Sequence, residues 1–263
     1  MKKYLWGILY ALFLTAFTVY VLMDTFVIER VYSIVQPEND GGGSESGQGG
    51  ASPILTAVSY ADDNISITIT EYREKDTTIY AADVQLSSAE YLQTALAKNA
   101  YGKNVTDKTS TIAADNGAIL AINGDYYGTQ ESGYVLRNGV LYRDKATSGR
   151  EALVIYADGS FEIITETSVS AQSLLEAGAW QILSFGPALV IDGQIAVTET
   201  EEVGKAMASN PRTAIGILEP LHYVFVVSDG RTEESEGLTL YELAEFMQSI
   251  GAATAYNLDG GGS

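Results

Sequence analysis

The chain has 263 residues, no cysteine, and a formal net charge of −19 from 15 Lys and Arg against 34 Asp and Glu. The lack of cysteine excludes disulfides, cysteine-ligated zinc or iron–sulfur sites and thiol nucleophiles. The acidic balance does not suit nucleic-acid binding, which needs clustered basic side chains, so no nucleic-acid partner is expected. A hydrophobic content of 46% is too high for a disordered chain. The composition therefore indicates a folded, acidic protein.

The first apolar feature is an uncharged run of 20 residues, from Tyr4 to Met23. A helix of this length spans about 30 Å, the thickness of the hydrocarbon core of a bilayer. Lys2 and Lys3 precede it, so the positive-inside rule places the N-terminus in the cytoplasm and the rest of the chain outside the cell. We interpret residues 1–30 as a cytoplasmic tip and a single-pass signal anchor in the cell membrane. A cleaved signal peptide is the main alternative, and a buried soluble helix is the second.

Residues 31–53 are predicted to form a linker. The stretch from Gln36 to Pro53, QPENDGGGSESGQGGASP, is rich in Gly and Ser and offers no apolar surface to bury. Such a sequence is typical of a flexible tether. Residues 54–263 are then expected to form one extracellular domain.

Most patterns in this domain predict strands. Ile65, Ile67 and Ile69 alternate with polar residues, as in a half-buried strand, and residues 78–84 resemble its partner. Residues 223–227 form a continuous apolar run that favours a buried central strand, and the run from 118 to 122 is expected to be a second buried strand. Three dipeptides between apolar runs predict two-residue hairpin turns: Asn138-Gly139, Asp158-Gly159 and Asp192-Gly193.

Two segments predict helices, residues 88–97 and 239–250. In the second, Thr239 and Glu242 form a capping box, apolar residues follow on one face, and Gly251 ends the helix. The expected fold class is α+β, with a mixed or mainly antiparallel sheet, a few packed helices, and one transmembrane helix before them.

Polar residues follow apolar strands at three places. Asn123, Gly124 and Asp125 come after residues 118–122, Arg212 follows an Asn-Pro dipeptide, and Asn257 and Asp259 flank Leu258, so that in a strand they share one face. Taken singly, these residues also suit ordinary turns or a surface ion pair. Together they predict a site in which carboxylates and amides bind sugar hydroxyls and an arginine binds a phosphate or carboxylate.

Other catalytic devices do not emerge from the sequence. His222 is the only histidine and begins an apolar strand, so we interpret it as structural. Neither a zinc-protease motif nor a P-loop is present, which leaves carboxylates as the acid and base groups. The Asp and Asn clusters carry the oxygen ligands that Ca²⁺ or Mg²⁺ prefers, but their spacing matches no recognised loop. No metal ligand is assigned.

Six segments resemble, in the same order, those of the phosphodiester glycosidase family: AINGDYYG, SFGPALVIDGQ, NPRTAIGI, YVFVVSDGR, GLTLYELAEFMQSIGA and NLDGGGS. Bacterial members of this family are often labelled exopolysaccharide biosynthesis proteins. The resemblance covers residues 60–263, and NPRTAIG together with NLDGGGS is its most specific pair.

The resemblance implies hydrolysis of a sugar linked through its anomeric carbon to a phosphodiester. It implies that Arg212 faces the phosphate and that Asp125 or Asp259 acts as base or nucleophile. The implied substrate-binding residues are Asn123, Gly124, Asn257, Gly260, Gly261 and Asp229, although the turn around Asp229 also suits a purely structural role. We therefore predict a membrane-anchored, extracytoplasmic hydrolase of sugar-1-phosphodiesters in cell-surface or exopolysaccharide metabolism. Its expected partners are a glycosyl phosphodiester or surface glycan and the membrane.

One departure from the family pattern concerns the C-terminus. Family members usually continue past the DGGGS segment with Thr and a further strand or hairpin, whereas this chain ends at Ser263. The expectation is a truncated chain or a form without the closing strand. Two readings without catalysis stay open: a surface-anchored carbohydrate-binding module and a structural envelope protein.

Overall fold

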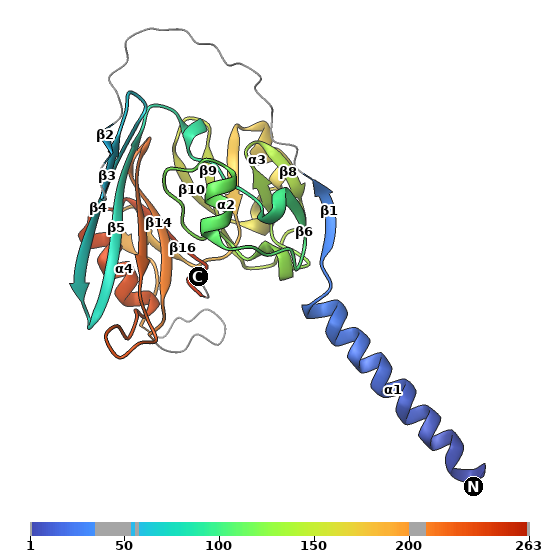
Figure 1. The fold of residues 1–263 in the computed structure, drawn as a ribbon. Helices are drawn as coiled ribbons and strands as arrows, with labels where there is room; N and C mark the ends of the chain where they lie inside the picture. Colours follow the sequence, from blue (N-terminus) through green and yellow to red (C-terminus); the bar gives the residue numbers. More distant parts are fainter. Residues whose placement is uncertain (1, 35–53, 56–57, 200–208, 262–263) are drawn as a thin grey trace.

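The computed structural model of the protein describes residues 2–34, 54–55, 58–199 and 209–261 (Figure 1). Most of the predicted linker, residues 31–53, and the end of the chain at Ser263 lie outside the described residues. The helices are α1 (Lys2–Phe26), α2 (Thr109–Asp115), α3 (Ala171–Glu176) and α4 (Leu240–Ser249), with 3-10 helices η1 (Ala89–Tyr91), η2 (Ala97–Asn99), η3 (Tyr127–Thr129) and η4 (Glu166–Ser168).

The described strands form three sheets. The largest has nine strands in the order β13 (Gln194–Ile195), β12 (Ala188–Ile191), β16 (Thr254–Leu258), β14 (Arg212–Glu219), β15 (His222–Ser228), β5 (Thr77–Leu86), β4 (Ile65–Glu74), β3 (Ser59–Ala61) and β2 (Ile54–Leu55). The second has five, in the order β10 (Phe161–Thr165), β9 (Glu151–Tyr156), β11 (Ala179–Leu183), β7 (Val135–Arg137) and β8 (Val140–Arg143). The third pairs β1 (Arg30–Ile34) with β6 (Ala100–Lys103).

Neighbouring strands in these sheets run antiparallel, so the predicted α+β class with a mainly antiparallel sheet is confirmed. The expected pairing of residues 65–69 with 78–84 is the β4–β5 ladder, in which Ile67 faces Val84. The apolar run at 223–227 is β15, in the middle of the nine-stranded sheet.

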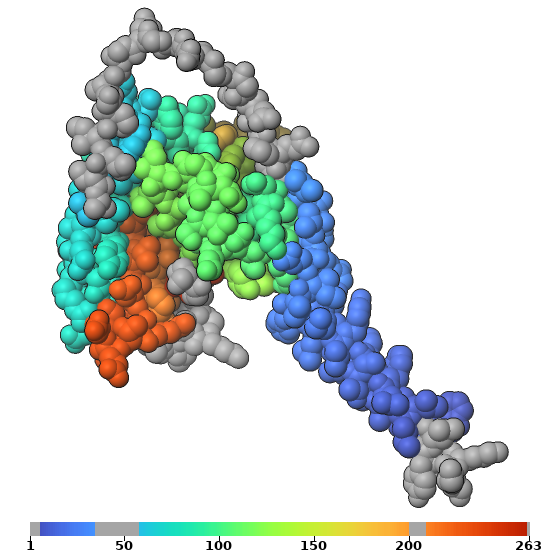
Figure 2. Space-filling model, in the orientation of Figure 1, coloured from blue at the N-terminus to red at the C-terminus, as the bar shows by residue number. Residues whose placement is uncertain are grey.

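Helix α1 contains a stretch, Trp6–Phe26, that is long and apolar enough to cross a membrane. It projects away from the domain (Figure 2), and its apolar side chains are exposed, with Trp6 at 78% and Phe13 at 69%. An exposed apolar surface of this size is costly in water. Residues Lys2–Phe26 are helical, so the predicted N-terminal apolar helix is confirmed.

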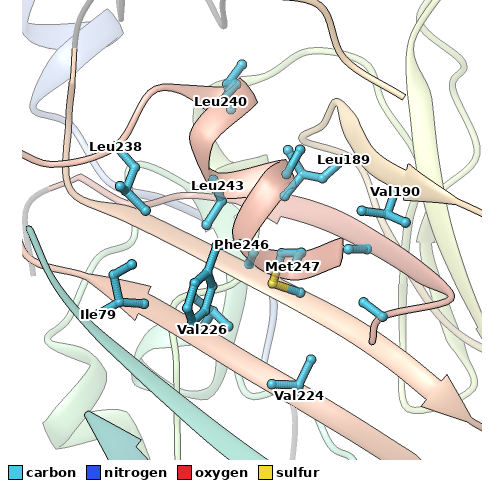
Figure 3. Close-up of a cluster of buried hydrophobic side chains, with 14 of the residues drawn as sticks. Ile79, Leu189, Val190, Val224, Val226, Leu238, Leu240, Leu243, Phe246 and Met247 are labelled. Carbon is cyan, nitrogen blue, oxygen red and sulfur yellow. The ribbon is translucent and has the colours of Figure 1, made fainter. Parts of the chain in front are cut away.

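The two large sheets and two helices form four layers. Helix α4 packs on one face of the nine-stranded sheet, where Leu243, Phe246 and Met247 meet Val224 and Val226 (Figure 3). On the other face, the nine-stranded sheet packs on the five-stranded one, whose outer face is covered by α3. The predicted capping box of α4 is present: Thr239 Oγ1 accepts the Glu242 amide at 3.1 Å, and the Glu242 carboxylate accepts the Thr239 amide at 2.9 Å.

The helix predicted over residues 88–97 is wrong. Only η1 and the first residue of η2, Ala97, are helical there, and residues 92–96 lie in no helix. Side chains from the five-stranded sheet take the backbone groups that a helix would use: Asn138 accepts from the Thr94 amide, and Trp180 donates to the Leu92 carbonyl. These tertiary hydrogen bonds override the local preference.

The strand predicted over residues 118–122 is also wrong, because this segment pairs with no described strand. Leu120 and Ile122 pack against the core between the two sheets, whereas Ile119 is 45% exposed. The apolar run reflects packing of Leu120 and Ile122 from an irregular segment rather than sheet pairing.

The hairpin predictions are largely confirmed. Asn138-Gly139 joins β7 to β8 and Asp192-Gly193 joins β12 to β13, with positive φ at both residues of each turn. The β9–β10 hairpin is present, but its connection has four residues, 157–160, so the two-residue turn predicted at Asp158-Gly159 is wrong.

Candidate active site

Arg212 stands at the start of β14, where three segments of the sequence meet. The Arg212 amide donates to Ser228 Oγ at 3.0 Å, and its Nε donates to the carbonyl oxygen of Leu238 at 2.8 Å. The residue is only 5% exposed. A guanidinium can bind a phosphate or carboxylate by paired hydrogen bonds, which is the role predicted for Arg212.

Two glycines allow the neighbouring segments to approach Arg212. A Cβ at Gly260 would lie 2.5 Å from the Arg212 Cα, and a Cβ at Gly230 would lie 2.7 Å from Pro211 Cδ. Neither position can carry a side chain without moving backbone. The segments NPRTAIG, VVSDGR and NLDGGGS are thus in direct contact, although 47 residues separate Arg212 from Asp259 in the sequence.

Asn210 and Arg231 join this contact and were missed by the sequence reasoning. The Arg231 guanidinium donates two hydrogen bonds to Asn210 Oδ1, at 3.0 and 2.7 Å. Both residues lie inside segments that the sequence singled out, NPRTAIG and VVSDGR, which was the available signal. The fork ties the turn after β15 to the start of β14.

Asn257 lies on the same face of the sheet as α4. It is 1% exposed, and its Nδ2 donates to the Gly186 carbonyl at 2.8 Å. Its Oδ1 is buried and has no hydrogen-bond partner among the described residues. Because buried polar atoms are nearly always paired, an orphaned acceptor at this point is suited to receive a hydroxyl or amide of a ligand.

Asp259 connects this face to the segment around Asn123. The Asp259 amide donates to the Gly124 carbonyl at 2.9 Å, and its carboxylate accepts the Gly261 amide at 3.0 Å. Asn123 is held in turn by Thr109, whose hydroxyl donates to its Oδ1 at 2.5 Å. The structure therefore brings the predicted residues of both segments together.

Asp125 points into a different environment, the buried space between the two sheets. Its Oδ1 accepts from Arg137 at 2.5 Å and its Oδ2 accepts the Ser184 amide at 2.9 Å. The side chains of Arg137 and Asp125 are 4% and 2% exposed. Arg137 was missed by the sequence reasoning; its place at the end of an apolar run before the Asn138 turn was the only signal. Both carboxylate oxygens of Asp125 are thus engaged by the protein itself.

The loop from Ser184 to Pro187 links the two environments. Ser184 Oγ donates to the buried carboxylate of Glu166, the Phe185 amide donates to the Tyr256 hydroxyl at 2.9 Å, and Gly186 accepts from Asn257. Burial raises the pKa of the Tyr256 hydroxyl, so it stays a neutral hydrogen-bond group. Asp125 and Glu166 thereby hold the loop that contacts Asn257.

Asp229 lies in the VVSDGR segment that contacts Arg212, whereas His222 lies at the other end of β15. Asp229 is exposed, its amide donates to the Thr78 carbonyl at 3.0 Å, and its negative charge raises the pKa of Tyr80. His222 Nε2 lies 2.9 Å from an oxygen of Asp83 at the far end of β15, which fits the structural role expected for it. Within the described part of the chain, no group of three or more His, Asp or Glu could hold a metal ion.

Residues 116–263 match the sequence model of the family described as phosphodiester glycosidase, which is more than half of the chain. The chain belongs to the phosphodiester glycosidase family. The resemblance expected from the six segments is thereby confirmed, and the cluster around Arg212, Asn257 and Asp259 lies within the matched residues.

Several known proteins are similar to this member of the family. It is 30% identical over 163 residues to the SPbeta prophage-derived uncharacterized protein YomE of Bacillus subtilis, covering 61% of this chain and 24% of that protein. It is 29% identical over 167 residues to the N-acetylglucosamine-1-phosphodiester alpha-N-acetylglucosaminidase of Bos taurus, covering 57% of this chain and 31% of that enzyme. The chain thus spans less than a third of the length of these relatives.

Two solved structures share the fold. The catalytic domain of the zebrafish N-acetylglucosamine-1-phosphodiester alpha-N-acetylglucosaminidase, auto-inhibited by its pro-peptide, aligns with a TM-score of 0.54 at 19% identity, covering 90% of this chain and 77% of that one. A hypothetical protein from Synechocystis aligns with a TM-score of 0.53 at 15% identity, covering 76% and 57%.

Proposed function

We propose that this protein is a membrane-anchored hydrolase that cleaves the glycosidic bond of sugar-1-phosphodiesters on the outer side of the cell membrane, in cell-surface or exopolysaccharide metabolism. The observation that best supports this proposal is the contact of three family segments around the buried Arg212. The buried Oδ1 of Asn257, on the same sheet face, has no partner among the described residues. The names of the mammalian and fish relatives supply the reaction class.

The roles follow from the contacts. Arg212 binds the phosphate, because a guanidinium fork matches its oxygens and disperses the charge that grows on them as the bond breaks. Asn257 Oδ1 accepts a hydrogen bond from a sugar hydroxyl, and Asn123 with the backbone of Gly124, Gly260 and Gly261 completes the binding surface.

Asp259 is better placed for catalysis than Asp125, the other carboxylate predicted at the site. It is only partly buried, and Gly261 is its one hydrogen-bond donor among the described residues, whereas Arg137 and Ser184 occupy both oxygens of Asp125. We assign Asp259 as base or nucleophile and Asp125 as a positioning residue.

The overall step adds water to the anomeric carbon and breaks the bond from that carbon to the phosphate oxygen. The electron pair of the broken bond leaves with that oxygen, which gives a phosphate monoester. The proton of the attacking water passes to Asp259, either directly or when water releases a covalent sugar from it.

The membrane anchor is supported by the exposed apolar stretch Trp6–Phe26 of α1 and by the two lysines, Lys2 and Lys3, at the start of that helix. With these lysines on the cytoplasmic side, the positive-inside rule favours a domain outside the cytoplasm. The divalent cation considered from the Asp and Asn clusters has no role in the proposed reaction.

The test uses the full chain in detergent and a soluble diester of N-acetylglucosamine-1-phosphate. The wild-type protein should release free sugar, and Asp259→Asn should lower the rate by about 10²–10⁴-fold, the range for loss of an acid–base group. Asp192→Asn, in the β12–β13 turn, is the matched control and should leave the rate unchanged.

Sugar release that survives Asp259→Asn would remove this residue from the mechanism. Glycan binding without release by the wild-type protein would favour the carbohydrate-binding module instead.

A further inference from the structure

The segment after the membrane helix is docked on the domain instead of forming a free tether. Strand β1 pairs with β6 in a register that sets Arg30 opposite Lys103. The rings of Tyr32 and Tyr101 lie 5.8 Å apart. A Cβ at Gly102 would lie 2.9 Å from the carbonyl carbon of Arg30, so the lack of a side chain there admits β1.

The end of α1 is held by the same part of the domain. Asn104 Nδ2 donates to the carbonyl oxygens of Thr25 at 3.1 Å and Ile28 at 3.2 Å. Lys98 Nζ lies 2.6 Å from an oxygen of Glu29. Because carbonyls at the end of a helix lack intrahelical partners, the Asn104 amide is a fitting cap for them. Strand pairing, cap and ion pair together fix the domain at the membrane end of α1.

A short path of contacts leads from this junction to the candidate site. Thr109, at the start of α2, is five residues beyond Asn104, which limits their separation to roughly 18 Å. Thr109 donates to Asn123, and the next residue, Gly124, accepts from Asp259. In Figure 1, α1 leaves the domain below β6, and β16 ends in the lower half of the domain, whereas β2 lies at the top.

The charge of the junction also suits a lipid surface. Residues 24–34 and 98–108 together carry four basic and three acidic residues, in a chain of net charge −19. Anionic head groups repel an acidic protein. An anionic lipid surface therefore repels the junction less than it repels the strongly acidic chain as a whole.

We propose that the domain rests on the membrane with its candidate site at the membrane side, and that its substrate is a glycosyl phosphodiester whose second ester is to a lipid alcohol of the same membrane. This inference rests on the proposed function. The sugar and phosphate of such a lipid stand in the head-group layer, directly above the hydrocarbon core. A docked domain meets them there at high effective concentration, whereas a released domain loses that advantage.

The test compares two substrates of the full chain reconstituted in phosphatidylcholine vesicles. One is the glycosyl phosphate of a long-chain prenol within the bilayer, and the other is a soluble methyl diester of the same sugar phosphate. Two release variants are designed to break the β1–β6 pairing. Val31→Pro removes a backbone donor from β1, and Gly102→Val places a side chain in β6 where the backbone of Arg30 packs. Val31→Thr keeps the backbone amide and is the matched control for Val31→Pro.

Both release variants should hydrolyse the soluble diester at the wild-type rate and the prenyl diester at least about tenfold more slowly, while Val31→Thr matches wild type on both. Should Gly102→Val fail to fold, Val31→Pro still decides, because β1 is exposed and lies outside the domain core.

Docking can also be measured without activity, because the chain has no cysteine. Arg30→Cys with Lys103→Cys should form an intramolecular disulfide in vesicles, and Arg30→Cys with Lys75→Cys, in the distant β4–β5 turn, should not. A failure of the first pair to cross-link would overturn the docked arrangement.

Undiminished prenyl-diester hydrolysis by the release variants would overturn the lipid inference, as would hydrolysis of only the soluble diester by wild type. Hydrolysis of neither diester by wild type would overturn the proposed function itself and the lipid substrate with it.

Discussion

Asn257 poses the clearest question at the scale of single residues, since its buried Oδ1 has no partner among the described residues. A protein tolerates such an atom where a ligand completes it. Asn257→Ala should lower kcat/KM for the diester by about 10–100-fold, from loss of a hydrogen bond worth about 1.5–3 kcal/mol to a polarised substrate group. Steady-state kinetics measure this effect.

Asn116→Ala is the control for this change, because among the described residues the Asn116 side chain bonds only to the Ile112 carbonyl of the helix that it caps. An Asn257→Ala protein with wild-type kinetics would show that the orphaned oxygen does not meet the substrate.

The buried pair of Asp125 and Arg137 makes a second prediction at this scale. Asp125→Asn should lower the free energy of unfolding by about 3–5 kcal/mol, because it leaves the Arg137 charge buried without its partner. Replacing both, as Asp125→Asn with Arg137→Met, should recover much of the loss, since the uncompensated charge is gone. Urea unfolding measures both variants.

Activity of the folded double variant then separates the two roles of Asp125. Residual hydrolysis would support the positioning role, and a folded but inactive double variant would return Asp125 to the list of catalytic carboxylates.

At the scale of elements, α4 covers the sheet face that carries Arg212 and Asn257, and its capping box fixes where the helix begins. Thr239→Ala removes the acceptor for the Glu242 amide and should cost about 1 kcal/mol in unfolding free energy. Thr70→Ala, an exposed strand residue, should change it by less than about 0.5 kcal/mol. Equal costs for the two changes would contradict the capping role.

The elements also show what the sequence could and could not predict. The α4 helix and the β4–β5 pair carry local signals, a capping box and a period-two pattern, and both form as expected. The helix predicted at 88–97 does not form, because side chains far away in the sequence bond to the backbone of this segment. Asn138 comes from the β7–β8 turn and Trp180 from β11. A local pattern contains no information on such partners.

The residues of the candidate site also fall into two groups, those predicted from the sequence and those missed. Arg212, Asn257 and Asp259 were predicted from polar residues at strand ends, and the structure brings their segments together. Arg137 and Arg231 were not predicted, because each looks like an ordinary polar residue beside a turn until the sheets are stacked.

At the scale of the whole molecule, burial of tyrosine side chains makes stability depend on pH in the alkaline range. Burial raises the pKa of Tyr127 to about 12 and that of Tyr223 to about 12. Between pH 10 and 12 the unfolded chain has lost these protons while the folded chain keeps them, so unfolding becomes more favourable as pH rises.

The free energy of unfolding should therefore fall through this interval in urea titrations at successive pH values. Tyr127→Phe should make that fall shallower, because it removes one titrating group and keeps the ring. An unchanged slope in this variant would contradict the assignment.

The order of the strands within the nine-stranded sheet is the other property of the whole molecule. Strand β16 lies between β12 and β14, and β15 pairs with β5, far away in sequence. This order joins the end of the chain to the Arg212 segment, and it was not predictable from patterns whose range is a few residues.

The central claim is that the bond broken is the one between the anomeric carbon and the phosphate oxygen. Hydrolysis of the soluble diester in ¹⁸O-labelled water, followed by mass spectrometry of both products, tests it directly. The account predicts the label in the released sugar and none in the phosphate monoester. Label in the phosphate would show attack at phosphorus and would contradict the assignment of this protein as a glycosidase.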